Sequence, residues 1–190
     1  MIELHGAFED LRPDPDTETL DLSFWPGRIP LKQRWRNNGL SADFLGDYVT
    51  TFFPLEDDNP ATQQRQSEIR SAVSFIANEL LENAMKFHDS RQVEPIDIQL
   101  CLYRDRIVFH ESNTCSPDAA AGFLAFVQRL LTSDPNELFL EQLEHNALSD
   151  GTAGLGYLTM INDYGADLAW CFDRSSGNGA RVTVQVTLPI

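Results

Sequence analysis

Three polar side chains interrupt an otherwise apolar helical segment, NELLENAMKFHD, at residues 78–89. Glu79, Asn83 and Lys86 are spaced three or four residues apart, so they share one face of the helix. A carboxylate can accept a proton, an amide oxygen can ligate Mg²⁺ and an ammonium group can contact phosphate. The spacing therefore favours a metal-nucleotide site, and the alternative is a solvated helix edge with an intrahelical ion pair.

A glycine-rich stretch, GTAGLGYL, follows later in the chain at residues 151–158. Gly154 and Gly156 stand at the start of an expected helix. There, missing side chains let a phosphate approach backbone N–H groups, and the helix dipole favours an anion. Alone, such a stretch is typical of a tight turn. Together with the polar line of residues 79–86, it indicates a phosphate site.

The elements that must position these groups follow from periodicity. Apolar residues at steps of three and four predict a helix over residues 63–88, and alternation predicts a hairpin over 96–109 that turns near Arg104 and Asp105. Two helical patterns lie between 113 and 151, a helix follows the glycine turn and ends at Gly165, and two strands finish the chain. We expect an α+β fold, a two-layer sandwich with helices on one face of a mixed, mostly antiparallel sheet.

The front of the chain is expected to extend this core. Residues 1–17, rich in Pro and Asp, predict a loose arm. Residues 18–60 predict a strand broken at Pro26-Gly27 and then a helix that starts at Ser41 and ends at Pro54. Residues 61–190 form the core of a single domain. The 18–60 extension is expected to pack on that core, and it could also build a dimer or partner surface.

The composition argues against nucleic acid and membrane surfaces as partners. The chain has 190 residues, 42% of them hydrophobic, and a net charge of −15, which would repel nucleic acid and anionic lipid. No apolar stretch is long enough to span a bilayer and no signal peptide is apparent, so a cytoplasmic location is expected. The three scattered cysteines predict reduced thiols.

In their order, these stretches resemble the GHKL ATPase family, the ATP-binding fold of histidine kinases, anti-sigma-factor kinases, gyrase B, Hsp90 and MutL. ELLENAMKF resembles the N box, GTAGLGYLTMI the second glycine box, and GNGARVTVQVTLP the closing glycine turn and last strand. The resemblance implies the Bergerat fold with ATP and Mg²⁺ as cofactors. It implies Glu79 as general base, Asn83 as Mg²⁺ ligand and Lys86 as a phosphate contact. Residues 113–151 would be the lid. The resemblance also implies that the backbone N–H groups of Gly154, Leu155 and Gly156 donate hydrogen bonds to the phosphates.

One motif departs from the family. In place of an Asp-x-Gly-x-Gly box, whose Asp accepts the adenine amino group, the chain has FHESNTC at residues 109–115. Glu111 stands at the expected strand end and could accept that bond, or Asn113 could accept it through its amide oxygen. Thr183 is the next candidate for holding adenine.

The chain resembles the small stand-alone members of the family. None of its four histidines lies in the context of a phosphoacceptor helix, so we expect no histidine kinase. The remaining types are anti-sigma-factor serine kinases and SiaB-like protein kinases, which residues 24–54 resemble. Such a protein would phosphorylate Ser or Thr of a small STAS-like or SiaC-like regulatory partner. Arg34, Trp35 and Arg36 could contact that partner, or Trp35 could be a core residue flanked by ion-paired arginines.

Two functions are therefore expected. The first is a bacterial signalling Ser/Thr kinase that uses Mg-ATP in a partner-switching pathway. The second is a non-catalytic, nucleotide-sensing or degenerate GHKL adaptor that sequesters a partner. The complete N box favours the kinase, and the altered adenine box favours the adaptor.

Overall fold

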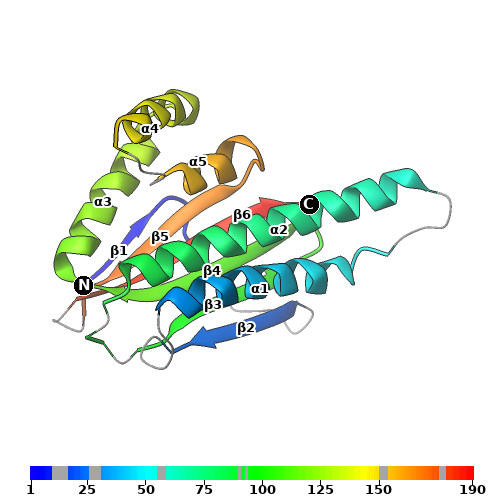
Figure 1. Ribbon diagram of the computed structural model, residues 1–190, viewed down its shortest axis with the longest axis horizontal. Helices are drawn as coiled ribbons and strands as arrows, with labels where there is room; N and C mark the ends of the chain where they lie inside the picture. Colours follow the sequence, from blue (N-terminus) through cyan, green and yellow to red (C-terminus); the bar gives the residue numbers. More distant parts are fainter. Residues whose placement is uncertain are drawn as a thin grey trace.

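The computed structural model describes residues 1–9, 17–25, 31–54, 59–89, 91–92, 94–149, 154–175 and 179–190 (Figure 1). Its elements, in chain order, are β1 Ile2–His5, β2 Glu18–Phe24, α1 Leu31–Thr50, α2 Pro60–Phe87, β3 Ile96–Leu102, β4 Arg106–Cys115, α3 Pro117–Thr132, α4 Pro135–Ser149, α5 Leu155–Asn162, β5 Asp167–Asp173 and β6 Ala180–Pro189.

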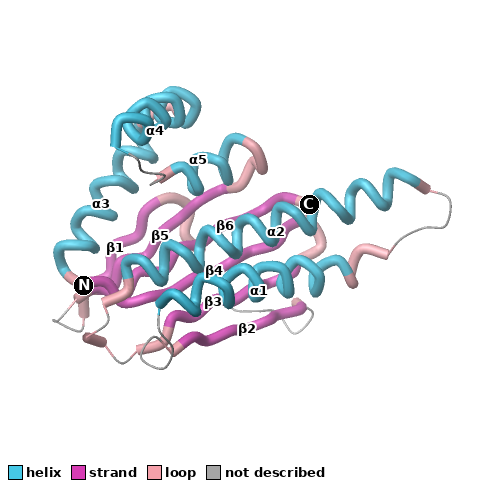
Figure 2. The backbone as a smooth tube through the Cα atoms, in the orientation of Figure 1, coloured by secondary structure: helices cyan, strands magenta, loops and turns pink. Residues whose placement is uncertain are grey.

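The six strands form one sheet in the order β1-β5-β6-β4-β3-β2. Every neighbouring pair is antiparallel. α1 and α2 lie side by side over one face of this sheet, and α2 contacts the neighbouring strands β4 and β3 (Figures 1 and 2). The predicted α+β sandwich is confirmed, and the sheet is wholly antiparallel where we expected a mixed one.

Helix α2 contains Glu79, Asn83 and Lys86, the polar line. Its sequence determines both where the helix begins and which face is buried. The Asn59 side chain accepts a hydrogen bond from the Ala61 N–H, and Pro60 occupies the first turn, where its missing N–H costs nothing. Its buried face holds apolar residues at helical spacing: Ile69, Ala72, Val73, Ile76, Ala77, Leu80, Leu81, Ala84 and Met85. The polar line of residues 79, 83 and 86 therefore runs along the border of a fixed core face.

The start of the chain is not the loose arm that we predicted. Residues Ile2–His5 form β1, which pairs with the outer edge of β5. Exposure alternates along β1, but the apolar residues Ile2 and Leu4 are the exposed ones, at 62% and 56%, so backbone pairing rather than burial of apolar side chains holds this strand. Past a turn at Gly6 (φ +73°), the Glu9 N–H donates to Gln185 in β6, so the chain crosses the helix-free face of the sheet.

The helix of the 18–60 extension begins earlier than the predicted start at Ser41. α1 spans Leu31–Thr50 and packs Ala42, Leu45 and Val49 into the core beside α2. Asn37-Asn38-Gly39 lies before the predicted start at Ser41, yet Asn38 is buried and a Cβ on Gly39 would meet nothing within 4 Å. Nothing there requires a glycine conformation, so the helix continues through it.

Two further expectations are met in the described part of the chain. Cys101 and Cys115 are free thiols, and no disulfide joins Cys171 to either of them. No described helix combines the length and the apolar character needed to cross a bilayer. Residues 113–115, which the prediction assigned to a lid, complete β4, and the helical segment that follows starts at Pro117.

Candidate functional site

A cavity of about 600 Å³ lies among α2, α3, α4 and α5. Its volume falls within the range of small-molecule sites. The walls bring together two segments far apart in the chain, the polar line of α2 and the glycine turn before α5. Its lining residues are Phe75, Glu79, Glu82, Asn83, Lys86, Phe87, Ala119, Gly122, Phe123, Phe126, Gln142, Gly154, Leu155, Gly156, Tyr157 and Thr159.

Glu79 is held against the glycine turn. A Cβ built on Gly156 would stand 2.0 Å from the Glu79 Oε2 atom, so no other residue fits at position 156 with the carboxylate in place. Burial raises the pKa of Glu79, and the nearby Glu82 carboxylate raises it further. A raised carboxyl pKa suits a group that accepts a proton near neutral pH.

Asn83 lies one turn further along α2 and lines the cavity, as does Tyr157 of α5. Burial raises the pKa of Tyr157 well above the usual phenol value, so its hydroxyl is neutral. An Asn side chain can present either its amide oxygen or its NH₂ group to a ligand in this cavity.

Lys86 occupies the exposed end of the line, in the last turn of α2. Its Nζ atom lies 5.2 Å from the ring centroid of Phe87, a cation-π distance. Both residues line the cavity. The ammonium group is thus at the cavity edge, where its long stem can reach an anion.

The glycine turn presents a helix start to the cavity. Gly154, at φ +82°, is the N-cap of α5, and no side chain caps the helix. The first N–H groups of an α-helix have no intrahelical partner and attract anions. A Cβ on Gly154 would meet Phe126 at 3.3 Å, so α3 packs closely over this turn. Gly151, Thr152 and Ala153, the start of the predicted glycine box, lie outside the described residues.

Glu111 and Asn113, the predicted adenine partners, lie in β4 and are not among the lining residues. Glu111 is 1% exposed, and its Oε1 atom has no hydrogen-bond partner among the described residues. Complete burial raises its pKa well above the usual carboxyl value. The Asn113 amide donates to the Ala84 carbonyl oxygen and to the Cys115 sulfur, both at 3.4 Å.

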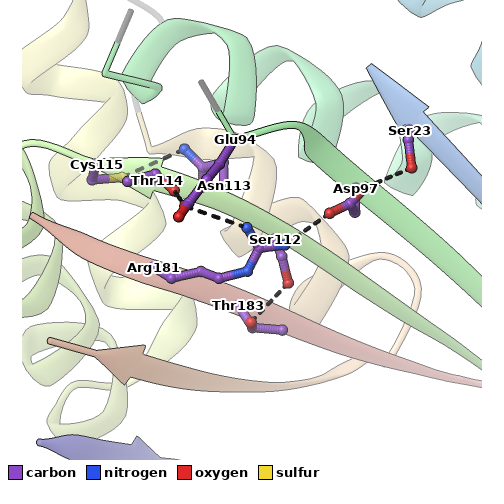
Figure 3. Close-up of polar contacts among 9 residues, drawn as sticks. All are labelled: Ser23, Glu94, Asp97, Ser112, Asn113, Thr114, Cys115, Arg181 and Thr183. Carbon is purple, nitrogen blue, oxygen red and sulfur yellow. Dashed lines mark hydrogen bonds and ion pairs between the residues drawn. The ribbon is translucent and has the colours of Figure 1, made fainter. Parts of the chain in front are cut away.

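Thr183 faces away from the cavity. Alternation in β6 turns Val182 and Val184 toward the helices, so Thr183 belongs to the opposite face. There its hydroxyl lies 2.8 Å from that of Ser112 in β4, beside the Arg181–Asp97 ion pair (Figure 3). This position does not suit the predicted contact with adenine.

Sequence reasoning missed Tyr157 and the aromatic wall that surrounds it. The Phe123 ring stacks on Tyr157 at 5.9 Å and Phe126 lies 6.1 Å from it, so α3 closes one side of the cavity. Gln142 of α4 also lines it. Tyr157 belongs to the glycine-box segment GTAGLGYLTMI, so its hydroxyl could have been predicted from sequence as a candidate site group. The contribution of α3 and α4 depends on tertiary packing alone.

The donor set fits a magnesium-nucleotide better than a metal held by protein alone. In the described ranges there is no group of three or more His, Cys, Asp or Glu side chains that could enclose an ion. Mg²⁺ bound with a nucleotide needs only one or two protein oxygens, because phosphates and water supply the rest. The amide oxygen of Asn83, which lines the same cavity as the α5 N-terminus, could supply one.

Comparison with known proteins supports the fold. No protein-family model matches the chain, and no curated protein matches it. The structure is similar to a chain in the crystal structure of the SiaB-SiaC complex from Pseudomonas aeruginosa, with a TM-score of 0.56 and 16% sequence identity. The match covers 90% of this chain and 89% of that chain. At this level of identity the likeness shows that the two chains share an overall fold.

Proposed function

We propose that this protein binds Mg-ATP in the cavity and transfers the γ-phosphoryl group to a Ser or Thr of a small regulatory protein. The observation that carries this proposal is the convergence of Glu79, Asn83 and the α5 N-terminus on one cavity. The GHKL resemblance of these segments supports it. The fold shared with a chain of the SiaB-SiaC complex supports a small partner protein and a partner-switching role.

The proposed reaction assigns a separate job to each group. Glu79 accepts the proton of the Ser or Thr hydroxyl of the partner. At the same time, the oxygen of that hydroxyl bonds to the γ-phosphorus. The bond from that phosphorus to the β,γ-bridging oxygen breaks, and ADP leaves. Bound Mg²⁺ would neutralise phosphate charge. Lys86 and the N–H groups at Gly154 to Gly156 would hold the phosphates, since positioning and charge neutralisation dominate phosphoryl transfer.

Burial of Glu111 favours a second candidate. A fully buried carboxyl group that is absent from the cavity wall is not presented to an adenine in this conformation. If base recognition is lost, the protein would act as a non-catalytic GHKL adaptor that sequesters its partner. The adaptor differs from the kinase in one respect that can be measured, which is the absence of phosphate transfer to a bound partner.

Two measurements test the proposed function. Calorimetry with ATP, with and without Mg²⁺, should show binding in the micromolar to submillimolar range that requires the metal. Incubation with labelled ATP and the proteins encoded beside this one should then label one of them. No heat with Mg-ATP in that range would reject nucleotide binding, and a tightly bound but unlabelled partner would favour the adaptor.

A further inference from the structure

Glu82 lines the cavity, yet the proposed reaction assigns no role to it. It is partly buried and lies three residues after Glu79 on α2, so the two side chains share one face with Cβ atoms about 5–6 Å apart. A carboxylate in this wall repels the phosphates of ATP. Its charge is therefore unfavourable to the nucleotide unless a cation binds beside it.

The ordinary cation for Glu82 would be Lys86, four residues later on the same helix. The structure does not form that pair. The Glu82 Oε1 atom accepts a hydrogen bond from the Asn78 amide at 3.0 Å, which draws the carboxylate toward the start of α2, and Lys86 lies over the Phe87 ring. Among the described residues Glu82 forms no ion pair. Its negative charge is thus available to a bound cation.

Two cations could meet Glu82 in the proposed reaction, Mg²⁺ or a basic side chain of the protein that accepts the phosphate. The metal already has the Asn83 oxygen, the phosphates and water as ligands. The accepting segment must bring its hydroxyl to Glu79, so side chains that flank this hydroxyl pass within one helical turn of Glu82. The net charge of −15 also favours a basic partner. These points favour a cation on the accepting segment.

We propose that Glu82 is a specificity-determining residue that binds a Lys or Arg within about three residues of the Ser or Thr to be phosphorylated. The inference rests on the proposed function and adds to it the chemistry of the accepting segment. One rival explanation is that Glu82 is a second ligand of Mg²⁺. The other is that it only stabilises α2 through its bond with Asn78.

Serine peptides and labelled Mg-ATP test the inference. The peptides have one length and carry Arg, Ala or Glu at each of the three positions on either side of the serine. At one position or more, wild type should use the Arg peptide about 10-fold better than the Glu peptide in kcat/KM. Glu82→Gln should reduce this ratio to about 2-fold or less, and Glu82→Arg should reverse it. Because both peptides use the same base, the ratio cancels any change in Glu79.

Glu68→Gln is the matched control. Glu68 also lies on α2 and accepts a hydrogen bond from an amide four residues earlier, that of Gln64 at 2.8 Å, but it does not line the cavity. The substitution removes the same charge and the same kind of bond from the same helix. It should keep the wild-type ratio. An equal change of the ratio in Glu68→Gln and Glu82→Gln would show an effect of net charge alone and overturn the inference.

Calorimetry with Mg-ATP separates the rival explanations. Glu82→Gln should bind Mg-ATP at least as tightly as wild type, because a repulsive charge is removed. A higher Mg²⁺ requirement in this variant would make Glu82 a metal ligand and overturn the inference. An unchanged peptide ratio in Glu82→Gln, or label on a partner protein but on no peptide, would overturn it and leave the proposed function intact. Absence of Mg-ATP binding in the wild type would reject the proposed function, and the inference with it.

Discussion

The Glu79 carboxylate lies against the backbone of Gly156, and a methyl group at position 156 would occupy the space of its Oε2 atom. These two residues come from α2 and α5, which are separated in the chain by a hairpin and two helices. Their contact joins the proposed base to the proposed phosphate turn. Gly156 therefore has two roles: it exposes its backbone N–H, and its missing side chain leaves room for the Glu79 carboxylate.

Gly156→Ala should therefore displace Glu79 and lower phosphoryl transfer about 100-fold. The Cβ would lie 2.8 Å from the Glu79 Cδ as well as 2.0 Å from Oε2, so the whole carboxyl group must move. Gly39→Ala is the matched control, since a Cβ there meets nothing within 4 Å. It should leave transfer unchanged and stabilise α1 by up to about 1 kcal/mol. Wild-type transfer by Gly156→Ala would show that Glu79 is not the base.

Glu79→Gln should leave Mg-ATP and partner binding nearly unchanged while transfer falls by about 100-fold or more. In the wild type the base must be ionised, so the rate should fall as pH drops through the raised pKa of Glu79. That acidic limb should lie above the ordinary Glu value of about 4.3. Glu82→Gln removes one of the two causes of the raised pKa and should move the limb to lower pH. A pH-rate profile measures both.

The polar line could be predicted from sequence because helical spacing fixes which side chains share a face. Glu79, Asn83 and Lys86 appear together in the cavity as the spacing required. Thr183 shows the limit of motif reasoning. Its place in the last strand was known, but the face it occupies depends on the register with Ser112 in β4, which follows from pairing across the sheet.

The N-terminal segment shows a second limit. In Ile2–His5 the apolar side chains of Ile2 and Leu4 are the exposed ones, so the sequence pattern did not indicate that this strand pairs with β5, near the other end of the sequence. The cavity wall formed by α3 could not be predicted either, because it also depends on contacts between distant segments. Phe123 and Phe126 lie in a segment for which the sequence predicted only a helix, and the packing of α3 over α5 turns them toward Tyr157.

Glu111→Gln should make the protein more stable than wild type, and the difference should grow as pH rises. The folded-state pKa of Glu111 is raised by burial, so the folded protein binds its proton more tightly than the unfolded chain does. The stability that this proton contributes is complete below the unfolded value of about 4.3 and is lost as pH rises toward the folded value. Urea unfolding from pH 4 to pH 8 measures the difference. A constant gap at all pH values would contradict a protonated, buried Glu111.

The same carboxyl group can be tested as a base contact. If Glu111 or Asn113 holds adenine, Glu111→Ala or Asn113→Ala should weaken ATP binding by about 1–3 kcal/mol, the usual cost of an unpaired buried polar group. Thr183→Ala serves as the control, because Thr183 lies on the far face of the sheet beside Ser112. Wild-type affinity in both β4 variants would show that adenine is held elsewhere.

The chemical stability of the phosphate formed separates the kinase from its alternatives. Asn83→Ala should lose both ATP binding and transfer, whereas Glu79→Gln should lose transfer alone, because the two side chains are assigned to the metal and to the acceptor hydroxyl. Label on the partner should survive acid, as a Ser or Thr phosphate ester does. Acid-labile label on this chain itself would instead indicate a histidine kinase. A partner that binds the wild type and both variants equally, and never acquires label, would identify the protein as an adaptor.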